Sequence, residues 1–364
     1  MKAGIVGLPN VGKSTLFNCL SNAKAQSANF PFCTIEPNIG VVNVPDERLV
    51  KLEELVNPQR VLPATVDIVD IAGLVKGASK GEGLGNQFLG NIRETDAILH
   101  VLRCFDNDNV VHVDGSVDPI RDKETIDIEL QLKDLETVEK RLEKVSRAAR
   151  TGNKEAIKEQ EALVKVKDGL ESGISVRAID LAPAEREEYT NQLQFITDKP
   201  VLYVCNVDEE AAVSGNAYVE QVKAAVADEN AEVLVLAVGT EADITELDTF
   251  EERQLFLEDL GLSEPGSAKL IRSAYKLLNL QTYFTAGEKE VRAWTIPVGA
   301  TAPQAAGVIH TDFEKGFIRA EVIKYSDYAA LGSEAKVKEA GKLGVEGKEY
   351  VVQDGDVMHF RFNV

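Results

Sequence analysis

Short apolar stretches separated by polar, helix-forming stretches recur along much of the chain. Ala3–Val6 is small and apolar, and Thr15–Ser21 has the composition of a helix start. Apolar stretches of this length, bounded by turn residues, are typical of strands buried in a parallel sheet. The same pattern predicts further strands at Ile39–Val44, Ala64–Asp70, Ala97–Arg103, Pro200–Cys205 and Val233–Val238. The chain is therefore predicted to be an α/β protein with a mostly parallel sheet.

A long stretch without a strand pattern separates Arg103 from Pro200. One crossover helix needs far fewer residues, so a separate element is inserted there. Apolar residues step by three and four along two runs, first at Leu135, Val138, Leu142, Val145 and Ala149, then at Ala156, Leu163, Val166 and Leu170. Because Thr151–Asn153 interrupts the pattern with a glycine, the two runs predict an antiparallel helical hairpin that resembles a short coiled coil.

The last part of the chain has a two-residue pattern instead. Apolar side chains take every second position at Met358, Phe360, Phe362 and Val364. This alternation predicts a strand with one apolar face, and Val291–Ile296 also has the pattern of a strand. A short helix is expected at Ala305–His310, which makes the tail a small α+β domain. The predicted domains are residues 1–120 plus 199–280, residues 121–198 and residues 281–364.

The segment Gly7–Ser14 matches the phosphate-binding pattern G-x-x-x-x-G-K-[ST] at every position, between a predicted strand and a predicted helix. Its glycines let successive backbone amides curl around a phosphate, and the helix start adds partial positive charge. Lys13 is placed to reach the outer phosphates, and Ser14 to bind Mg²⁺. An ordinary glycine-containing turn is the alternative, which the flanking strand and helix disfavour. The predicted nucleotide-binding residues of this segment are Asn10, Val11, Gly12, Lys13, Ser14 and Thr15.

Two further segments are expected to face the terminal phosphate. Thr34 lies in a loop bracketed by prolines, where a threonine can close on Mg²⁺, although an exposed loop hydroxyl is the alternative. Asp70–Gly73 has the form D-x-x-G, in which the carboxylate holds a Mg²⁺-bound water and the Gly73 amide approaches the phosphate. The predicted metal-binding residues are Ser14, Thr34 and Asp70. Leu74 stands where many GTPases carry a water-orienting glutamine, so hydrolysis needs another device.

Histidine could supply that device. His100 falls inside a predicted buried strand and is expected to be a packed core residue. His112 lies in the polar loop that follows, where it could position a water, because histidine titrates near neutrality. A surface histidine without a catalytic role is the other interpretation. The predicted catalytic residues are Lys13, Thr34, Gly73 and His112.

The strand predicted after the insertion is followed by N-V-D-E at residues 206–209. GTPases place N-K-x-D here, and the aspartate accepts both donors on the guanine edge. Val207 replaces the lysine and Glu209 replaces the aspartate, which argues against guanine selectivity. Asn206, Val207 and Glu209 are predicted to frame the base, together with Ala237 and Val238 at the end of the last strand of this sheet.

Composition narrows the classes of partner. The net charge of −20 over 364 residues argues against non-specific nucleic-acid binding by the chain as a whole. Residues 121–198 and 281–364 are nearly balanced in charge, so a polyanion, if one is bound, is expected to contact those segments. No apolar run is long enough for a membrane helix, and the first strand leaves no room for a signal peptide. The 4 cysteines form no CxxC pair, which favours a reducing, cytoplasmic compartment.

These motifs together closely resemble the YchF/Obg-like ATPase family, and the resemblance runs essentially end to end. Its most specific stretches are residues 7–15, 29–37 and 70–78, and residues 284–295 look like the TGS domain, a ubiquitin-like β-grasp module. The resemblance implies hydrolysis of ATP in preference to GTP, and association with the ribosome. It also implies that Asn10 binds a K⁺ ion near the phosphates, in addition to the Mg²⁺ ion.

Three functions stay open at this point. The leading hypothesis is a slow Mg²⁺-dependent ATPase that works as a ribosome-associated switch in translation or stress response. Its expected partners are ATP or GTP, the large subunit or the whole ribosome, and RNA, with no membrane partner and a monomeric chain. The alternatives are a GTP-specific ribosome-assembly factor and a non-hydrolysing adaptor in which nucleotide only orders two loops for binding RNA or the ribosome.

Overall fold

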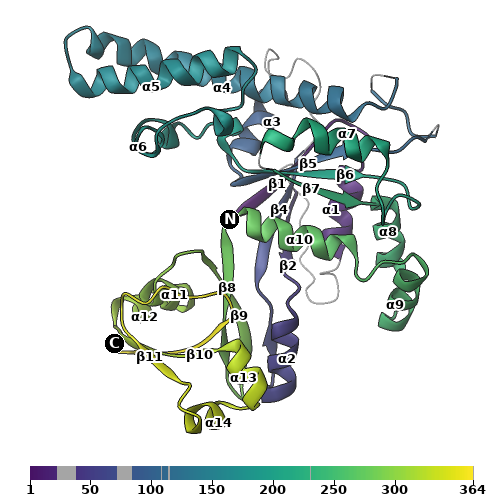
Figure 1. Cartoon of the computed structure of the whole chain (residues 1–364), viewed down its shortest axis with the longest axis vertical. Helices are drawn as coiled ribbons and strands as arrows, with labels where there is room; N and C mark the ends of the chain where they lie inside the picture. Colours follow the sequence, from purple (N-terminus) through teal and green to yellow (C-terminus); the bar gives the residue numbers. More distant parts are fainter. Residues whose placement is uncertain (23–37, 72–83, 108, 114, 230, 364) are drawn as a thin grey trace. The chain divides into compact units, whose positions relative to one another are not determined.

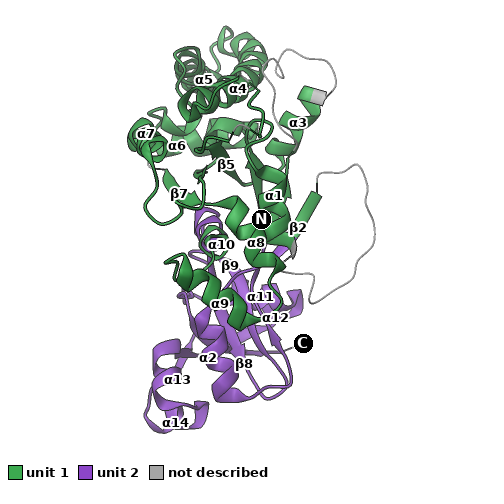
Figure 2. Cartoon of the chain, turned by 90° about the vertical axis from the view of Figure 1, so that its right-hand side faces the viewer, with its two compact units in different colours: residues 1–40, 67–270 green, residues 41–66, 271–364 purple. Residues whose placement is uncertain are grey.

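The computed structural model describes residues 1–22, 38–71, 84–107, 109–113, 115–229 and 231–363. Two compact units are present, residues 1–40 with 67–270 and residues 41–66 with 271–364 (Figure 2). The chain leaves the first unit within strand β2 (Asn38–Asn43) and returns within β4 (Thr65–Asp70). It passes into the second unit again within helix α10 (Gly266–Leu277), and each unit has its own sheet.

The sheet of the first unit has six strands in the order β2-β4-β1-β5-β6-β7. The bounds of the others are β1 Lys2–Val6, β5 Ala97–Arg103, β6 Val201–Asn206 and β7 Glu232–Leu236. The pairs β4–β1, β1–β5, β5–β6 and β6–β7 are all parallel. The predicted α/β class with a mostly parallel sheet is confirmed. Because these strands run in one direction, the loops at their carboxyl ends meet at one edge of the sheet.

Helices cover this sheet on both sides (Figure 1). α1 (Lys13–Asn22) packs against α8 (Val238–Glu246), while α7 (Ala217–Ala225) contacts the long helix α4 (Pro119–Ala149). The other helices of this unit before and after the insertion are α3 Leu84–Arg93 and α9 Phe250–Asp259. Every residue of β5 is buried, as expected for a central parallel strand with helices on both faces.

The insertion is an antiparallel helical hairpin, as predicted. α4 is followed by α5 (Lys154–Glu171), and Arg141 of α4 forms an ion pair with Glu159 of α5 at 2.6 Å. α4 begins at Pro119 after the N-cap Asp118, and Asn153 caps the start of α5. The residues that step by three and four along both helices form or pack against one buried cluster, in which Val138, Leu163 and Val166 are fully buried. The apolar periodicity therefore corresponds to the packed face of the hairpin.

Short helical turns lead from the hairpin back to β6. They are η1 Val176–Ala178, α6 Pro183–Glu185, η2 Arg186–Thr190, η3 Asn191–Leu193 and η4 Ile196–Asp198. Asp134 of α4 is fully buried and accepts hydrogen bonds from the backbone amides of Ile196 and Thr197, at 2.9 and 2.7 Å. The carboxylate satisfies amides at the start of η4 and so anchors this connection to the hairpin.

The sheet of the second unit has the order β11-β10-β12-β8-β9-β3. Its strands are β3 Val61–Leu62, β8 Leu280–Ala286, β9 Val291–Pro297, β10 Phe317–Lys324, β11 Gly344–Glu346 and β12 Asp356–Phe362. Its helices are α2 Glu47–Val56, α11 Ala302–Ile309, α12 Thr311–Lys315, α13 Tyr325–Leu331 and α14 Glu334–Glu339. Met358 and Phe360 of β12 are buried in the core, whereas His359 and Arg361 are exposed. The predicted one-sided strand and the short helix near residue 305 are confirmed, and Val364 lies outside the described residues.

Residues 41–66 pack with the C-terminal part of the chain. β3 pairs in parallel with β9, and Arg48 of α2 donates a hydrogen bond to Asp354 at 2.7 Å and lies over the ring of Phe284. The sequence predicts this segment to be in the nucleotide-binding domain, so the two compact units divide the chain differently from the three predicted domains. The predicted boundaries near residues 120, 198 and 280 stay a proposal.

Candidate nucleotide-binding site

The sequence predicts a set of site residues, and those that the structure describes lie in the loops at the carboxyl ends of the parallel strands or at the helix starts that follow these loops. The phosphate-binding loop, residues 7–12, follows β1 and leads into α1. Asp70 ends β4, His112 follows β5, Asn206 ends β6, and Ala237 follows β7. Thr34, Gly73 and Leu74 lie outside the described residues.

Two glycines of the phosphate-binding loop sit where a side chain has no room. A Cβ atom on Gly7 would lie 2.5 Å from the carbonyl oxygen of Val101. A Cβ atom on Gly12 would lie 2.5 Å from Nδ2 of Asn206, and the φ angle of Gly12 is +100°. Both positions therefore require glycine, on steric grounds and, at Gly12, on backbone grounds as well. The loop delivers the first amides of α1, which have no partner within the helix, to the edge of the sheet.

Lys13 is the first residue of α1, and its side chain folds back along the loop. Its ammonium donates a hydrogen bond to the carbonyl oxygen of Leu8 at 2.6 Å. Burial lowers the pKa of Lys13 to about 8, and the nearby negative charge of Asp70 offsets part of that shift. A buried ammonium has lost part of its hydration, so a nearby phosphate charge stabilises it more than it would stabilise an exposed ammonium.

This lowered pKa predicts a pH dependence of nucleotide affinity. Phosphates favour the charged form of Lys13, so binding above pH 8 takes up a proton, and affinity falls as pH rises through about 8. Between pH 7 and pH 9 we expect the Kd for ATP with Mg²⁺ to rise about tenfold, measured by titration calorimetry in buffers of different ionisation heat. The Lys13→Arg variant stays charged at both pH values, so a similar rise in that variant would contradict this explanation.

Asp70 and Ser14 complete the part of the site that is expected to hold the phosphates and Mg²⁺. Burial raises the pKa of Asp70, while the charge of Lys13 and a hydrogen bond from the Ser14 side chain act to lower it. Among the described residues, no group donates a hydrogen bond to the buried Oδ1 atom of Asp70. A buried carboxylate oxygen without a partner fits a water molecule held by Mg²⁺, which keeps most of its waters and takes few protein ligands.

Asn206 joins the phosphate-binding loop to the segment expected beside the base. Its Nδ2 donates to the carbonyl oxygen of Val11 at 2.9 Å, and its Oδ1 accepts from the backbone amide of Val238 at 3.0 Å. Both ends of the buried amide are therefore used by main-chain groups. Asn206 therefore fixes the position of the phosphate-binding loop relative to Ala237 and Val238, which are predicted to lie beside the base.

The next residues differ in their exposure. Val207 is buried, and its amide donates to the carbonyl oxygen of Leu236 at 3.0 Å. Asp208 accepts a hydrogen bond from the backbone amide of Ala211 at 3.0 Å, so its carboxylate closes the turn after β6. Glu209 is exposed at the same turn. The carboxylate of Asp208 thus has a local structural role, and Glu209 is the predicted base-facing acid.

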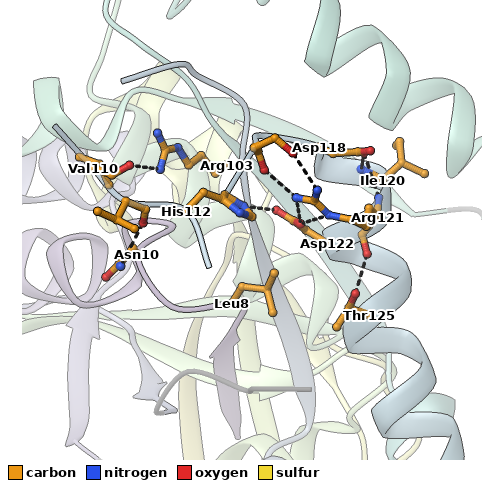
Figure 3. Close-up of polar contacts among 12 residues, drawn as sticks. Leu8, Asn10, Arg103, Val110, His112, Asp118, Ile120, Arg121, Asp122 and Thr125 are labelled. Atoms are coloured by element: carbon orange, nitrogen blue, oxygen red, sulfur yellow. Dashed lines mark hydrogen bonds and ion pairs between the residues drawn. The ribbon is translucent and has the colours of Figure 1, made fainter. Parts of the chain in front are cut away.

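His112 is not a surface residue, although the sequence alone leaves that interpretation open. It is 7% exposed, and its Nε2 lies 2.8 Å from Oδ2 of Asp122, which is 1% exposed (Figure 3). The neighbouring Val111 accepts a hydrogen bond at its carbonyl oxygen from Nδ2 of Asn10, at 3.2 Å. The loop that carries His112 therefore contacts the phosphate-binding loop directly. A role for His112 in catalysis stays a proposal.

Arg103 shapes the loop between β5 and His112. This fully buried side chain donates from Nε to the carbonyl oxygen of Phe105 at 3.1 Å, from Nη2 to that of Asn107 at 3.1 Å, and from Nη1 to that of Val110 at 2.9 Å. The planar guanidinium can serve several acceptors at once. Sequence reasoning missed this residue, although a charge that ends an otherwise apolar strand indicates a buried role.

His100 is the packed core residue that the sequence predicts. It is buried in β5, with its ring centroid 5.5 Å from that of Tyr203. Burial lowers the pKa of His100 to about 4. Its side chain is therefore neutral at physiological pH and belongs to the core of the sheet.

Comparison with known proteins gives matches along the whole chain. The family described as "50S ribosome-binding GTPase" matches residues 2–142, and the family YchF-GTPase_C, described as "Protein of unknown function (DUF933)", matches residues 280–363. A protein of Escherichia coli O157:H7 named "Ribosome-binding ATPase YchF" is 59% identical over 363 residues, which cover 100% of this chain and 99% of that protein. This chain belongs to the YchF family.

Other YchF proteins extend the comparison to a distant organism. The Bacillus subtilis (strain 168) "Ribosome-binding ATPase YchF" is 57% identical over 366 residues, which cover 100% of both chains. A solved structure titled "Structure of the Schizosaccharomyces pombe YchF GTPase" superimposes with a TM-score of 0.88 at 42% identity, covering 99% of this chain and 97% of that chain. Both the hairpin and the C-terminal unit thus belong to the part that the YchF family shares.

The names of these YchF relatives specify different nucleotides as the one that is hydrolysed. The two bacterial proteins are named ATPases, whereas the yeast structure is titled a GTPase. The base preference of this member is therefore a matter for its own base-side residues. In the part of the chain that the structure describes, no helix has both the length and the apolar character that crossing a membrane requires.

Proposed function

We propose that this YchF-family chain is a Mg²⁺-dependent nucleoside triphosphatase that hydrolyses ATP in preference to GTP and acts as a ribosome-associated switch. The observation that carries the proposal is the cluster of Lys13, Ser14 and Asp70 beside the phosphate-binding loop. It combines a buried ammonium, whose pKa is lowered to about 8, with a buried carboxylate oxygen that has no partner among the described residues. This is the donor set that Mg²⁺ and a triphosphate need together.

Each residue of the phosphate end has a separate task. The backbone amides of the loop and of the α1 start bind phosphate oxygens, and Lys13 moves its donor from Leu8 to the outer phosphates. Ser14 would bind Mg²⁺ directly, and Asp70 would do so through a water. When bound, Mg²⁺ neutralises the charge that develops on the phosphate oxygens. Thr34 and Gly73 would complete this end from the two segments outside the described residues.

The base preference rests on Val207 and Glu209. The aspartate of the GTPase pattern accepts two donors from guanine, and it works beside a lysine stem that this chain replaces with a buried valine. The longer side chain of Glu209 places its oxygens at a different point of the pocket. Adenine presents the N1 acceptor where guanine has the N1 donor, and a C2–H where guanine has its amino group. Loss of the matching acceptor pair removes the reason to prefer guanine.

Water activation is assigned to His112 and to a K⁺ ion. His112 is held by Asp122 in a loop that touches the phosphate-binding loop, and an imidazole nitrogen can accept the proton of an attacking water. Val111 uses the Nδ2 donor of Asn10, and Oδ1 is the atom of that amide that would bind K⁺. A bound K⁺ would offset transition-state charge in a site that has Leu74 in place of glutamine.

The ribosome is the proposed partner, because the bacterial relatives are named for binding it. Binding to ribosomes would place the chain in the cytoplasm. The hairpin and the C-terminal segment are the surfaces proposed for this contact and for RNA, because residues 121–198 and 281–364 are nearly balanced in charge while the chain carries −20.

Phosphate release from ATP and from GTP, with and without ribosomes and K⁺, tests the proposal. We expect ATP turnover that increases when ribosomes and K⁺ are added. The kcat/KM for GTP should be at least about tenfold lower than the kcat/KM for ATP. Restoring the GTPase pattern with Val207→Lys and Glu209→Asp should raise GTP affinity about tenfold, whereas Glu210→Asp, one residue further along the turn, should not. Faster GTP turnover would favour the assembly-factor alternative, and no turnover of either nucleotide would favour the adaptor.

A further inference from the structure

The side chain of His112 is held by a residue of another element. Asp122 lies in the first turn of α4, the first helix of the hairpin, and its Oδ2 is 2.8 Å from His112 Nε2. Both side chains are buried, so water cannot replace this contact without rearrangement. Figure 3 shows the imidazole of His112 directed toward Asp122, and the adjacent Val111 accepts a hydrogen bond from Asn10 of the phosphate-binding loop.

Asp122 is itself fixed by a neighbour. Its second oxygen, Oδ1, accepts hydrogen bonds from Nε and Nη2 of Arg121, at 3.2 and 2.9 Å. Arg121 also donates to the backbone carbonyl oxygen of Ser116 at 2.7 Å. The carboxylate is therefore paired with a cation on one oxygen and offers the other to the imidazole. In this geometry the carboxylate accepts hydrogen bonds at both oxygens.

The direction of the hydrogen bond fixes the tautomer of His112. An ionised Asp122 requires that Nε2 carries the proton, so Nδ1 carries the lone pair in the neutral ring. In a general base, the nitrogen with the lone pair is the one that accepts a proton.

We propose that Asp122 is the positioning residue of His112, an inference that rests on the function proposed above. It sets the orientation and the tautomer of the ring beside the phosphates. Arg103 supports the same loop by binding the carbonyl oxygen of Val110, and Asn10 binds that of Val111. The backbone on the N-terminal side of His112 is therefore held at two consecutive residues, and Asp122 holds the ring.

The first test follows ATP turnover in variants of Asp122. For Asp122→Ala we expect kcat to fall about 10²-fold, with KM changed less than about twofold, because the ring is misplaced while the phosphate contacts remain. The isosteric Asp122→Asn keeps the shape and should lose about tenfold in kcat. His112→Ala combined with Asp122→Ala should be no slower than His112→Ala alone, because the two residues act as one unit.

Asp134→Asn is the matched control. Asp134 is also a buried aspartate of α4, and it binds main-chain amides at Ile196 and Thr197 instead of a site residue. We expect this variant to lower the melting temperature as much as Asp122→Asn does, without loss of kcat. If Asp122→Ala and Asp122→Asn keep the kcat of the control, or if the double variant loses activity additively, the proposal is wrong.

A second readout does not depend on hydrolysis. The chain has 4 histidines, so the ring nitrogens of His112 can be assigned by ¹⁵N-resolved NMR of the full chain. We expect a proton on Nε2 of His112 in the wild type and a mixture of tautomers in Asp122→Asn. A wild-type ring protonated on Nδ1 alone would overturn the positioning role even with normal turnover. An Nε2 proton that Asp122 controls, in a protein without ATP turnover, would support the positioning role and contradict the proposed function instead.

Discussion

Lys13→Ala is expected to lower ATP turnover by about 10²–10³-fold and to weaken ATP binding as well. The ammonium is buried, its hydrogen bond among the described residues goes to the main chain at Leu8, and its pKa is lowered to about 8. Phosphate oxygens would compensate the buried ammonium for its lost hydration. The attraction between Lys13 and the phosphates would then strengthen as charge moves to the β- and γ-phosphates in the transition state. Single-turnover phosphate release and equilibrium binding of ATP measure the two losses separately.

Lys199→Ala is the matched control for that variant. Lys199 is also partly buried with a lowered pKa, and its ammonium donates to the carbonyl oxygen of Arg93 at 3.0 Å. It lies just before β6, at the end of the sheet opposite the phosphate-binding loop. We expect Lys199→Ala to lose thermal stability while it keeps ATP affinity. Equal losses of affinity in both variants would mean that the effect of Lys13 is structural.

His112→Ala is expected to lower kcat by about 10²-fold or more with little change in KM. The imidazole is proposed to act on the attacking water and not on the bound phosphates, so its loss should appear in the chemical step. Steady-state kinetics at saturating ATP, with ribosomes and K⁺ present, gives kcat directly. Pre-steady-state measurements would show whether phosphate release or chemistry has become slower.

His100→Gln controls for the loss of a buried histidine. His100 packs against Tyr203 in the sheet, and the lowered pKa keeps it neutral. We expect this variant to be less stable but equally fast at saturating ATP. A His112→Ala enzyme with wild-type kcat would remove histidine from the mechanism and leave bound K⁺ or a partner as the means of water activation.

The elements with a strong local pattern are those that the sequence predicts correctly. The hairpin follows from apolar steps of three and four that include Val138 and Val166, and the last strand follows from the alternation of Met358 and Phe360. The packing of residues 41–66 has no such pattern. It depends on the pairing of β3 with β9 and on the contact of Arg48 with Asp354, which join parts of the chain far apart in sequence.

The site shows the same division between local motifs and long-range contacts. Lys13, Ser14, Asp70 and Asn206 come from motifs in which the spacing itself carries the chemistry. The role of Asp122 could not be predicted, because it depends on how the start of α4 folds back onto the loop after β5.

The motif at residues 206–209 predicts which residues lie near the base of the nucleotide, but it does not predict their hydrogen bonds. Asn206 proved to bind main-chain groups of Val11 and Val238, which only the folded chain brings together. Its hydrogen bonds connect the phosphate side to the base side, so its contribution to nucleotide binding is indirect.

The most direct measurement is a crystal structure of the chain with a non-hydrolysable ATP analogue and Mg²⁺. We expect the phosphates within the curve of residues 7–12 and at the start of α1, with the Lys13 ammonium moved from Leu8 to the outer phosphates. Mg²⁺ should lie on Oγ of Ser14, with a bound water at Oδ1 of Asp70. An analogue bound elsewhere, with Lys13 still on Leu8, would contradict the account.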